Sequence, residues 1–261
     1  MTDIPALLTA IDGLGPPFRV IRLTPGDTAA TETAAGNQRF HGMQLCDPAS
    51  GQARRMVELH AQFRGMETGR HAGSLVFQRY CHRVCAVAVA AWMLHGVALD
   101  LHAAGVSVRF TDGSPDLLTL HSPQVLKDAT PEQVLTATVD GHLRPLAEAV
   151  SAETGPGMGN LMGNIAAGFA GGFRALADRP DTGLTTHHIR EHAELLLSAR
   201  PELRRGGEFR ILSDPAGPRL FYDRKSCCHW YAAPDGRYCS WCSRLSQDER
   251  TRRFEEAMTR G

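Results

Sequence analysis

The sequence predicts an α+β protein whose middle is mostly helical, with small β-hairpins and a cysteine-rich C-terminal module. Three observations support this fold class. Apolar residues recur densely over 74–95 and again over 158–176, as in buried helices. Short strand-like runs flank turn-forming residues at 106–122 and at 208–223. Four of the seven cysteines then fall between positions 227 and 242.

The first half of the chain shows clear start and stop signals. A strand is expected at 18–23, and a helix from Ser74 to His95 should stop at Gly96. The hairpin at 106–122 should turn around Asp112-Gly113, a dipeptide typical of tight β-turns.

The second half continues with helices and a second hairpin. Thr130 and Gln133 have the spacing of a capping box, and Pro145 should kink the helix that follows. Further helices are expected over 158–176 and 186–199, and 200–207 is the expected domain boundary. After the hairpin at 208–223 and the cysteines, Ser246 and Glu249 predict the cap of a closing helix. These signals divide the chain into an α+β region, 1–205, and a C-terminal module, 206–261.

The composition is that of a folded protein without a broad charged surface. The 261 residues are 43% hydrophobic and 21% charged, and the 28 basic side chains equal the 28 acidic ones in number. This length suffices for one large domain or two modest ones. The neutral balance gives no electrostatic signature of nucleic-acid binding.

Neither a secretory signal nor a membrane span is predicted. Residues 1–15 lack a basic region before their short apolar run, and the most apolar stretch, 84–99, is too short for a transmembrane helix. We therefore expect a cytoplasmic protein, with loose association with the inner face of the membrane left open. In a reducing compartment, clustered cysteines bind metals more often than they form disulfides.

The cysteine cluster has the spacing C-C-x10-C-x2-C. Its members are Cys227, Cys228, Cys239 and Cys242, hereafter the motif cysteines. A disulfide-linked loop, a structural zinc and an iron–sulfur cluster are the three alternatives. The C-x2-C half suits zinc and iron–sulfur equally. The adjacent pair favours a two-iron cluster, because neighbouring side chains in extended backbone point to opposite faces and zinc motifs usually space their cysteines more widely.

The spacer between the two halves must fold back. Fully extended, it would separate them by roughly 35 Å. The Pro-Asp-Gly sequence at 234–236 is a strong turn signal at its centre, so a hairpin is expected there.

The motif and its position near the C-terminus resemble the FhuF-type ferric-siderophore reductases. In that family the four cysteines bind a [2Fe–2S] cluster, and all four positions are present here. Looser similarity covers much of 70–245. The resemblance implies a siderophore-binding region over 1–205 and a [2Fe–2S] module over 206–261, with no catalytic residue beyond the cluster ligands.

The function that the resemblance implies is one-electron reduction of a ferric siderophore, releasing Fe(II) in the cytoplasm. No flavin or nicotinamide motif is visible, so an external electron donor is expected, such as a ferredoxin, a flavodoxin or an NAD(P)H-linked reductase. Two alternatives stay open at this point: a zinc-knuckle binding protein, and a [2Fe–2S] sensor or electron carrier with another substrate.

Several side chains near the motif could tune such a cluster. The aromatic and cationic candidates around the cysteines are His229, Trp230, Arg237, Tyr238 and Trp241. They would shield the cluster or influence its potential, although the aromatic ones could equally form the core of a small module. Arg224, Lys225 and Arg237 would raise the potential of the cluster and could attract an anionic complex or an acidic electron donor, or would be ordinary solvated surface charges.

Two other patterns are interpreted as structural. Cys81 and Cys85 share a face of the helix over 74–95, and free cysteines of this kind usually pack in a core. His188, Glu191 and His192 match a zinc-protease pattern, but no third ligand follows, so a polar helix face is expected.

Overall fold

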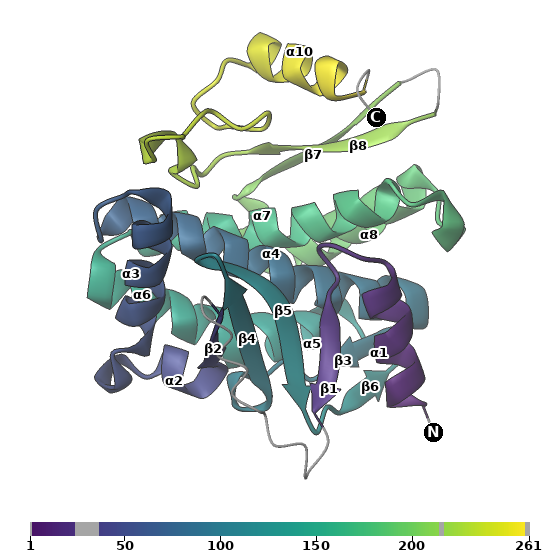
Figure 1. The fold of residues 1–261 in the computed structure, drawn as a ribbon. Helices are drawn as coiled ribbons and strands as arrows, with labels where there is room; N and C mark the ends of the chain where they lie inside the picture. The colour runs from purple at the N-terminus through teal and green to yellow at the C-terminus, as the bar shows by residue number, and fades with distance from the viewer. Residues whose placement is uncertain (1, 24–36, 214–216, 259–261) are drawn as a thin grey trace.

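The computed structural model describes residues 2–23, 37–213 and 217–258. It confirms the α+β class: a small sheet packs on a helical core, and a C-terminal hairpin and helix lie on the other side of that core (Figure 1). Helix α4, Arg70–His95, and helix α7, Met158–Ala177, run through the middle. Within the described residues, no helix is long and apolar enough to cross a membrane.

The larger sheet has the strand order β1-β5-β4-β2. Its strands are β1 (Val20–Leu23), β2 (Asn37–His41), β4 (Val106–Thr111) and β5 (Ser114–His121). The pairs β2–β4 and β4–β5 are antiparallel, and β1 adds to β5 in parallel. The predicted hairpin is confirmed: Asp112 and Gly113 connect β4 and β5 with φ of 48° and 63°, the left-handed pair that a tight hairpin turn requires.

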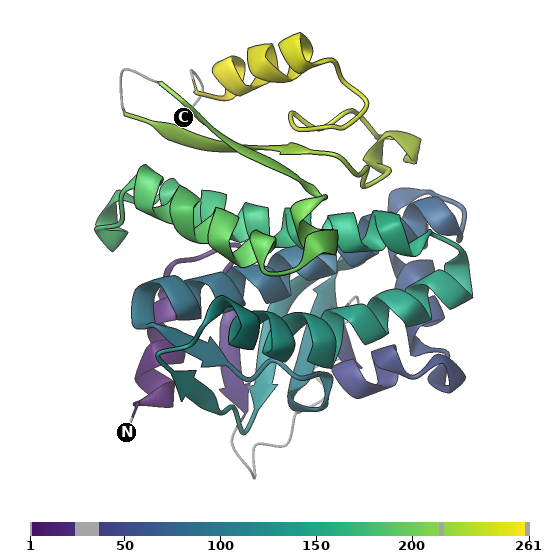
Figure 2. The ribbon, with the colours of Figure 1, turned by 180° about the vertical axis from the view of Figure 1, so that it is seen from behind.

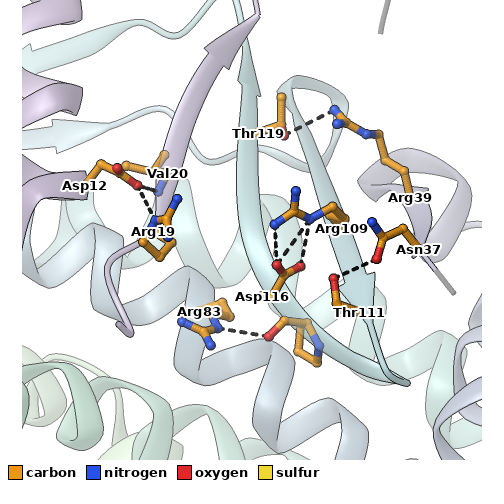
Figure 3. A network of polar contacts seen from close by, with 11 residues as sticks. Asp12, Arg19, Val20, Asn37, Arg39, Arg83, Arg109, Thr111, Asp116 and Thr119 are labelled. Carbon is orange, nitrogen blue, oxygen red and sulfur yellow. Dashed lines mark hydrogen bonds and ion pairs between the residues drawn. The ribbon is translucent and has the colours of Figure 1, made fainter. Parts of the chain in front are cut away.

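Polar contacts tie this sheet together and attach it to α4 (Figure 3). Arg109 of β4 donates from Nε to the two carboxylate oxygens of Asp116 on β5, at 3.0 and 3.2 Å. Arg83 of α4 donates to the carbonyl of Pro115 at 2.9 Å. Asp12 accepts from the backbone N–H of Val20 at 2.9 Å, which fixes the start of β1.

Helices α4 and α7 form the centre of the core. They approach closely because α7 carries small residues: a Cβ on Gly168 would lie 2.9 Å from the Cβ of Cys81. Cys81 and Cys85 are fully buried, and burial raises the pKa of both thiols well above the usual value. The core interpretation of these two cysteines is confirmed.

Most of the expected helices are present. Helix α5, Pro131–Leu135, starts at the predicted capping box, passes into a π-helical segment, Thr136–Leu143, and continues as α6, Arg144–Thr154. The irregularity therefore precedes Pro145. Helix α8, Thr186–Ser198, follows α7, and the expected boundary at 200–207 contains a short helix, α9, Pro201–Arg204.

Several elements were not predicted. These are α1 (Ile4–Gly13), β2, α2 (Gly42–Cys46), α3 (Gln52–Arg64), β3 (Val97–Leu99) and β6 (Val125–Lys127). Helix α1 has an N-cap signal, because the Asp3 carboxylate accepts from the backbone N–H of Ala6 at 3.0 Å. Strands β3 and β6 form a separate antiparallel pair.

The C-terminal part begins with the second predicted hairpin. Strands β7, Gly207–Leu212, and β8, Arg219–Arg224, pair antiparallel, and residues 214–216 between them lie outside the described residues. The closing helix α10, Gln247–Met258, is capped by Ser246, whose hydroxyl accepts from the backbone N–H of Glu249 at 3.2 Å. Hairpin and helix lie over α7, as both ribbon views show (Figures 1 and 2). Strand β8 thus leads directly into the segment that contains the motif cysteines.

Candidate functional site

The motif cysteines lie in a segment without strands. After β8, the chain bends at Lys225 and Ser226, passes through Cys227 and Cys228, forms a 3-10 turn at Trp230–Ala232, and turns again at 234–235. The predicted hairpin is therefore wrong in form: the spacer folds back through a 3-10 turn, closed by a hydrogen bond from Gly236 N to Ala233 O at 2.7 Å. The expected turn at 234–236 is present.

The spacer turn is docked on the helical core. Asp235 accepts from Arg64, the last residue of α3, at 2.9 Å. The Pro234 ring lies next to Gly65, where a Cβ would be 3.6 Å from Cγ of the proline. These two contacts hold the spacer folded back, so that Cys239 comes close to Cys228.

The four thiols touch one another in a closed ring. Each thiol of the diagonal pair Cys227 and Cys239 is hydrogen-bonded to the other two, Cys228 and Cys242. These bonds raise the pKa of the first pair and lower the pKa of the second, so the four thiols titrate as one interacting group. All four cysteines are free of disulfides.

Backbone N–H groups also point at the sulfurs. His229 N donates to Cys227 Sγ at 3.4 Å, and the N–H groups of Trp230 and Arg244 act in the same way on the cysteines two residues earlier. His229 has a left-handed φ of 66°, which non-glycine residues rarely adopt. This bend directly follows the adjacent pair, Cys227 and Cys228, whose thiols both join the ring.

Buried nitrogen atoms without partners belong to residues close to the motif cysteines in the chain. Within the described residues, Arg224 Nε and Nη1, His229 Nδ1 and Trp230 Nε1 are buried and have no partner. Buried polar groups are nearly always paired, so four such atoms within six residues of a motif cysteine need an explanation. An anionic, sulfur-rich group would supply acceptors for them.

The residues present therefore fit an iron–sulfur cluster by donor chemistry. Four thiols in mutual contact provide the complete ligand set, and the N–H groups provide hydrogen bonds to sulfur. Within the described residues, no three or more His, Cys, Asp or Glu side chains, the motif cysteines included, are arranged around one metal ion; the fit of the motif cysteines therefore rests on their donor chemistry and mutual contacts. His188 and His192 lie against each other on the polar face of α8, with ring centroids 4.2 Å apart and the rings tilted by 46°.

A cavity of about 190 Å³ separates the cysteine segment from helix α4. The cysteine side of its lining includes Cys228, Cys239 and Trp241, and the α4 side includes the polar residues Arg79 and His82. Burial, followed by the charge of Arg224, lowers the pKa of His82 to about 3, so this imidazole is neutral. Arg79 Nε is buried without a partner among the described residues.

The predicted tuning residues occupy different positions. Trp230 and Trp241 line the cavity next to the thiols. Arg237 stacks on the Trp230 ring at 5.2 Å, and Tyr238 is 42% exposed, so these two lie on the outer side. His229 is half-buried against His71, with ring centroids 5.0 Å apart.

A partly buried polar network attaches the cysteine segment to both central helices. Asn160 of α7 donates to the carbonyl of Cys227 at 2.7 Å, and its own side-chain oxygen accepts from Ser74 of α4 at 2.7 Å. One turn later, a Cβ on Gly163 would lie 2.4 Å from the side chain of Ser226. The helix that carries these residues therefore fixes the position of the first two cysteines.

Sequence reasoning missed this network and part of the cavity. Asn160 and Asn164 are four residues apart on an otherwise apolar helix, a signal that could have marked a polar contact face. Of the two alternatives for Arg224, the solvated surface charge is wrong, because the side chain is 1% exposed. Lys225 is exposed and pairs with Glu208, as a solvated charge does.

Comparison with solved structures finds siderophore synthetases. ATP-bound aerobactin synthetase IucA from a hypervirulent Klebsiella pneumoniae pathotype shares 15% identity and a TM-score of 0.46 over 59% of this chain and 31% of that chain. Aerobactin synthetase IucC from the same source shares 14% identity and a TM-score of 0.44, over 64% of this chain and 32% of that chain. The chain thus covers about a third of the length of these synthetases. No curated protein sequence matches.

The model of a known protein family also matches this chain. The model of the family described as ferric iron reductase FhuF-like transporter matches residues 74–205. The match includes α4 and α7, which hold the cysteine segment, and ends before the motif cysteines. The chain belongs to this FhuF-like ferric iron reductase family.

Proposed function

We propose that this chain is a cytoplasmic ferric-siderophore reductase that holds a [2Fe–2S] cluster on the motif cysteines. The observation that carries the proposal is the closed ring of four thiols, docked on the two helices that belong to the family-matched region. Residues 1–205 would bind the siderophore, and residues 206–261 would hold the cluster.

The reaction requires a one-electron donor next to the bound substrate. When bound, the cluster supplies single electrons at a potential set by its surroundings. The electron comes from an external donor, such as a ferredoxin, a flavodoxin or an NAD(P)H-linked reductase. Fe(III)–siderophore plus one electron gives Fe(II) and the free siderophore, because the hard oxygen ligands hold the less charged ion more weakly.

The protein's own groups prepare the site for this transfer. Trp230 and Trp241 restrict water at the thiols, and the neutral His82 bonds to Gln78 through Nε2 at 2.9 Å. Arg79 and Arg224 bring positive charge to the same region, since Cys228 interacts with both. No proton transfer or covalent intermediate is required of any side chain.

A larger hollow offers an outer approach to the same cysteines. It measures about 540 Å³, and Cys239, Trp230 and Tyr238 line it together with part of α10. Arg237 also lines it, so an anionic ferric complex or an acidic donor would meet positive charge there.

The function is tested with anaerobically reconstituted protein. The chain is loaded with iron and sulfide, reduced with dithionite, freed of excess reductant, and mixed with hydroxamate, catecholate and mixed-ligand ferric siderophores in the presence of an Fe(II) chelator. We expect reoxidation of the protein and stoichiometric Fe(II) trapping with at least one class. Reduced, cluster-loaded protein that is reoxidised by none of the three classes would contradict the reductase function.

A variant pair controls for adventitious iron. Cys239→Ser should abolish both cluster loading and Fe(II) release, whereas Cys81→Ser, in the core and outside the thiol ring, should retain both. Equal Fe(II) release by Cys239→Ser and by the unchanged chain would show that the motif cysteines are not the source of the electron.

A further inference from the structure

Arg224 is a buried cation without a counter-charge. It ends β8 and is 1% exposed, yet no carboxylate pairs with it among the described residues. Its Nη2 donates to Asn164 Oδ1 at 2.6 Å and to Ser226 Oγ at 3.3 Å. Its Nε and Nη1 have no partner within the described chain. Most of its charge and two of its donor atoms are therefore uncompensated.

The guanidinium is held in place by a neutral support. Asn164 of α7 is fully buried, and its Nδ2 donates to the carbonyl and the hydroxyl of Ser74 at 3.1 and 3.0 Å. These bonds orient Oδ1 of Asn164 towards Arg224. Because the support is an amide and not a carboxylate, it fixes the arginine without neutralising it.

An unpaired buried charge is strongly disfavoured unless an anion lies nearby. The motif cysteines lie next to Arg224, because it ends the strand that leads into them and its charge acts on both Cys228 and Cys239; as ligands of a cluster they would be thiolates. His82, on which the charge of Arg224 also acts, is neutral, and Arg79 and Arg174 add positive charge near it. The motif cysteines are thus the anionic partner that this arrangement supplies.

We propose that Arg224 is the internal counter-ion of the motif-cysteine centre and raises its reduction potential. The inference rests on the proposed function, since it assigns a role towards the cluster held there. Adding one electron to a thiolate-ligated centre adds one negative charge. A fixed, desolvated cation therefore stabilises the reduced form more than the oxidised form. Arg224 thus acts on the centre through its charge and not through contact with the substrate.

The test is the midpoint potential of cluster-loaded variants, measured by EPR-monitored redox titration. Arg224→Met removes the charge and keeps an apolar stem of similar length. We expect its reduction equilibrium to shift at least tenfold towards the oxidised form, about 59 mV for a one-electron couple. Lys225→Met is the matched control, because it removes a neighbouring positive charge that is exposed and paired with Glu208. It should shift the equilibrium less than twofold.

Two further variants separate charge from packing. Arg224→Lys keeps the charge and should stay within threefold of the unchanged chain. Asn164→Asp places a carboxylate beside the arginine and should shift the equilibrium in the same direction as Arg224→Met, which keeps the test available where Arg224→Met does not fold. Equal potentials in Arg224→Met, Lys225→Met and the unchanged chain would overturn the inference, and so would an Arg224→Lys shift as large as that of Arg224→Met.

A measurement of loading distinguishes failure of this inference from failure of the proposed function. If the unchanged chain takes up no iron and sulfide, the proposed function and the inference fail together. If it loads normally and its potential does not depend on Arg224, only the inference fails. Thermal unfolding gives a second readout: loading should raise the unfolding temperature of the unchanged chain more than that of Arg224→Met, and an equal rise would count against the counter-ion role.

Discussion

Replacing Gly163 by alanine should disturb the docking of the cysteine segment on α7. In the structure, a Cβ at this position would lie 2.4 Å from both Cβ and Oγ of Ser226, the residue before the first motif cysteine. Such a distance is far inside van der Waals contact, so either the helix or the segment must move. Gly159, one turn earlier on the same helix, has no atom within 4 Å of an added Cβ and is the natural control.

The size of the effect follows from two opposing terms. Alanine gains up to about 1 kcal/mol over glycine inside a helix, and both variants share this gain. Overpacking at a close contact costs about 1–3 kcal/mol, and only Gly163→Ala pays it. The free energy of unfolding of Gly163→Ala should therefore fall about 1–3 kcal/mol below that of Gly159→Ala.

Urea unfolding of both variants, with matched m-values, measures this difference. Iron and sulfide content after reconstitution measures whether the displaced segment still forms the centre, and we expect lower loading in Gly163→Ala alone. Equal stability and equal loading of the two alanine variants would refute the reasoning, because the close approach of Ser226 to α7 would then have no energetic consequence.

Three further predictions concern the centre, its docking and the core. Serine at any one motif cysteine should reduce iron and sulfide content severalfold by metal analysis, whereas Cys81→Ser should change stability and not content. Asn160→Ala leaves the carbonyl of Cys227 without its 2.7 Å donor and should cost about 1–3 kcal/mol in urea unfolding; an unchanged midpoint would show that water replaces the amide. Burial lowers the pKa of His142 to about 4 from 6.5, so the unfolded state takes up the proton first as pH falls. Stability should drop by up to about 3 kcal/mol between pH 6.5 and pH 4, and His142→Gln should flatten this part of the profile.

Local signals predicted much of the fold. The Thr130 capping box, the Asp112-Gly113 turn and the Gly96 stop each act through their own neighbours, and each is present in the structure. Strand β1 was also predicted, but its parallel pairing with β5 was not. That pairing joins segments about a hundred residues apart, and nothing in either segment specifies its partner.

The site divides in the same way. The spacing of the motif cysteines predicted a common site, and the Pro-Asp-Gly sequence predicted the turn at 234–236. The four thiols do lie together in one ring. The burial of Arg224 could not be predicted from the sequence, because it depends on the packing of α7 over the end of β8. The cavity wall from α4 is likewise a tertiary feature, formed by residues more than a hundred positions before the cysteines.

Metal and sulfide analysis of the anaerobically handled protein, combined with EPR after dithionite reduction, tests the central claim most directly. The account predicts coloured protein with equal amounts of iron and acid-labile sulfide, about two of each per chain, and an EPR signal that appears on one-electron reduction. Colourless protein that carries zinc, about one per chain, and gives no EPR signal on reduction would contradict it.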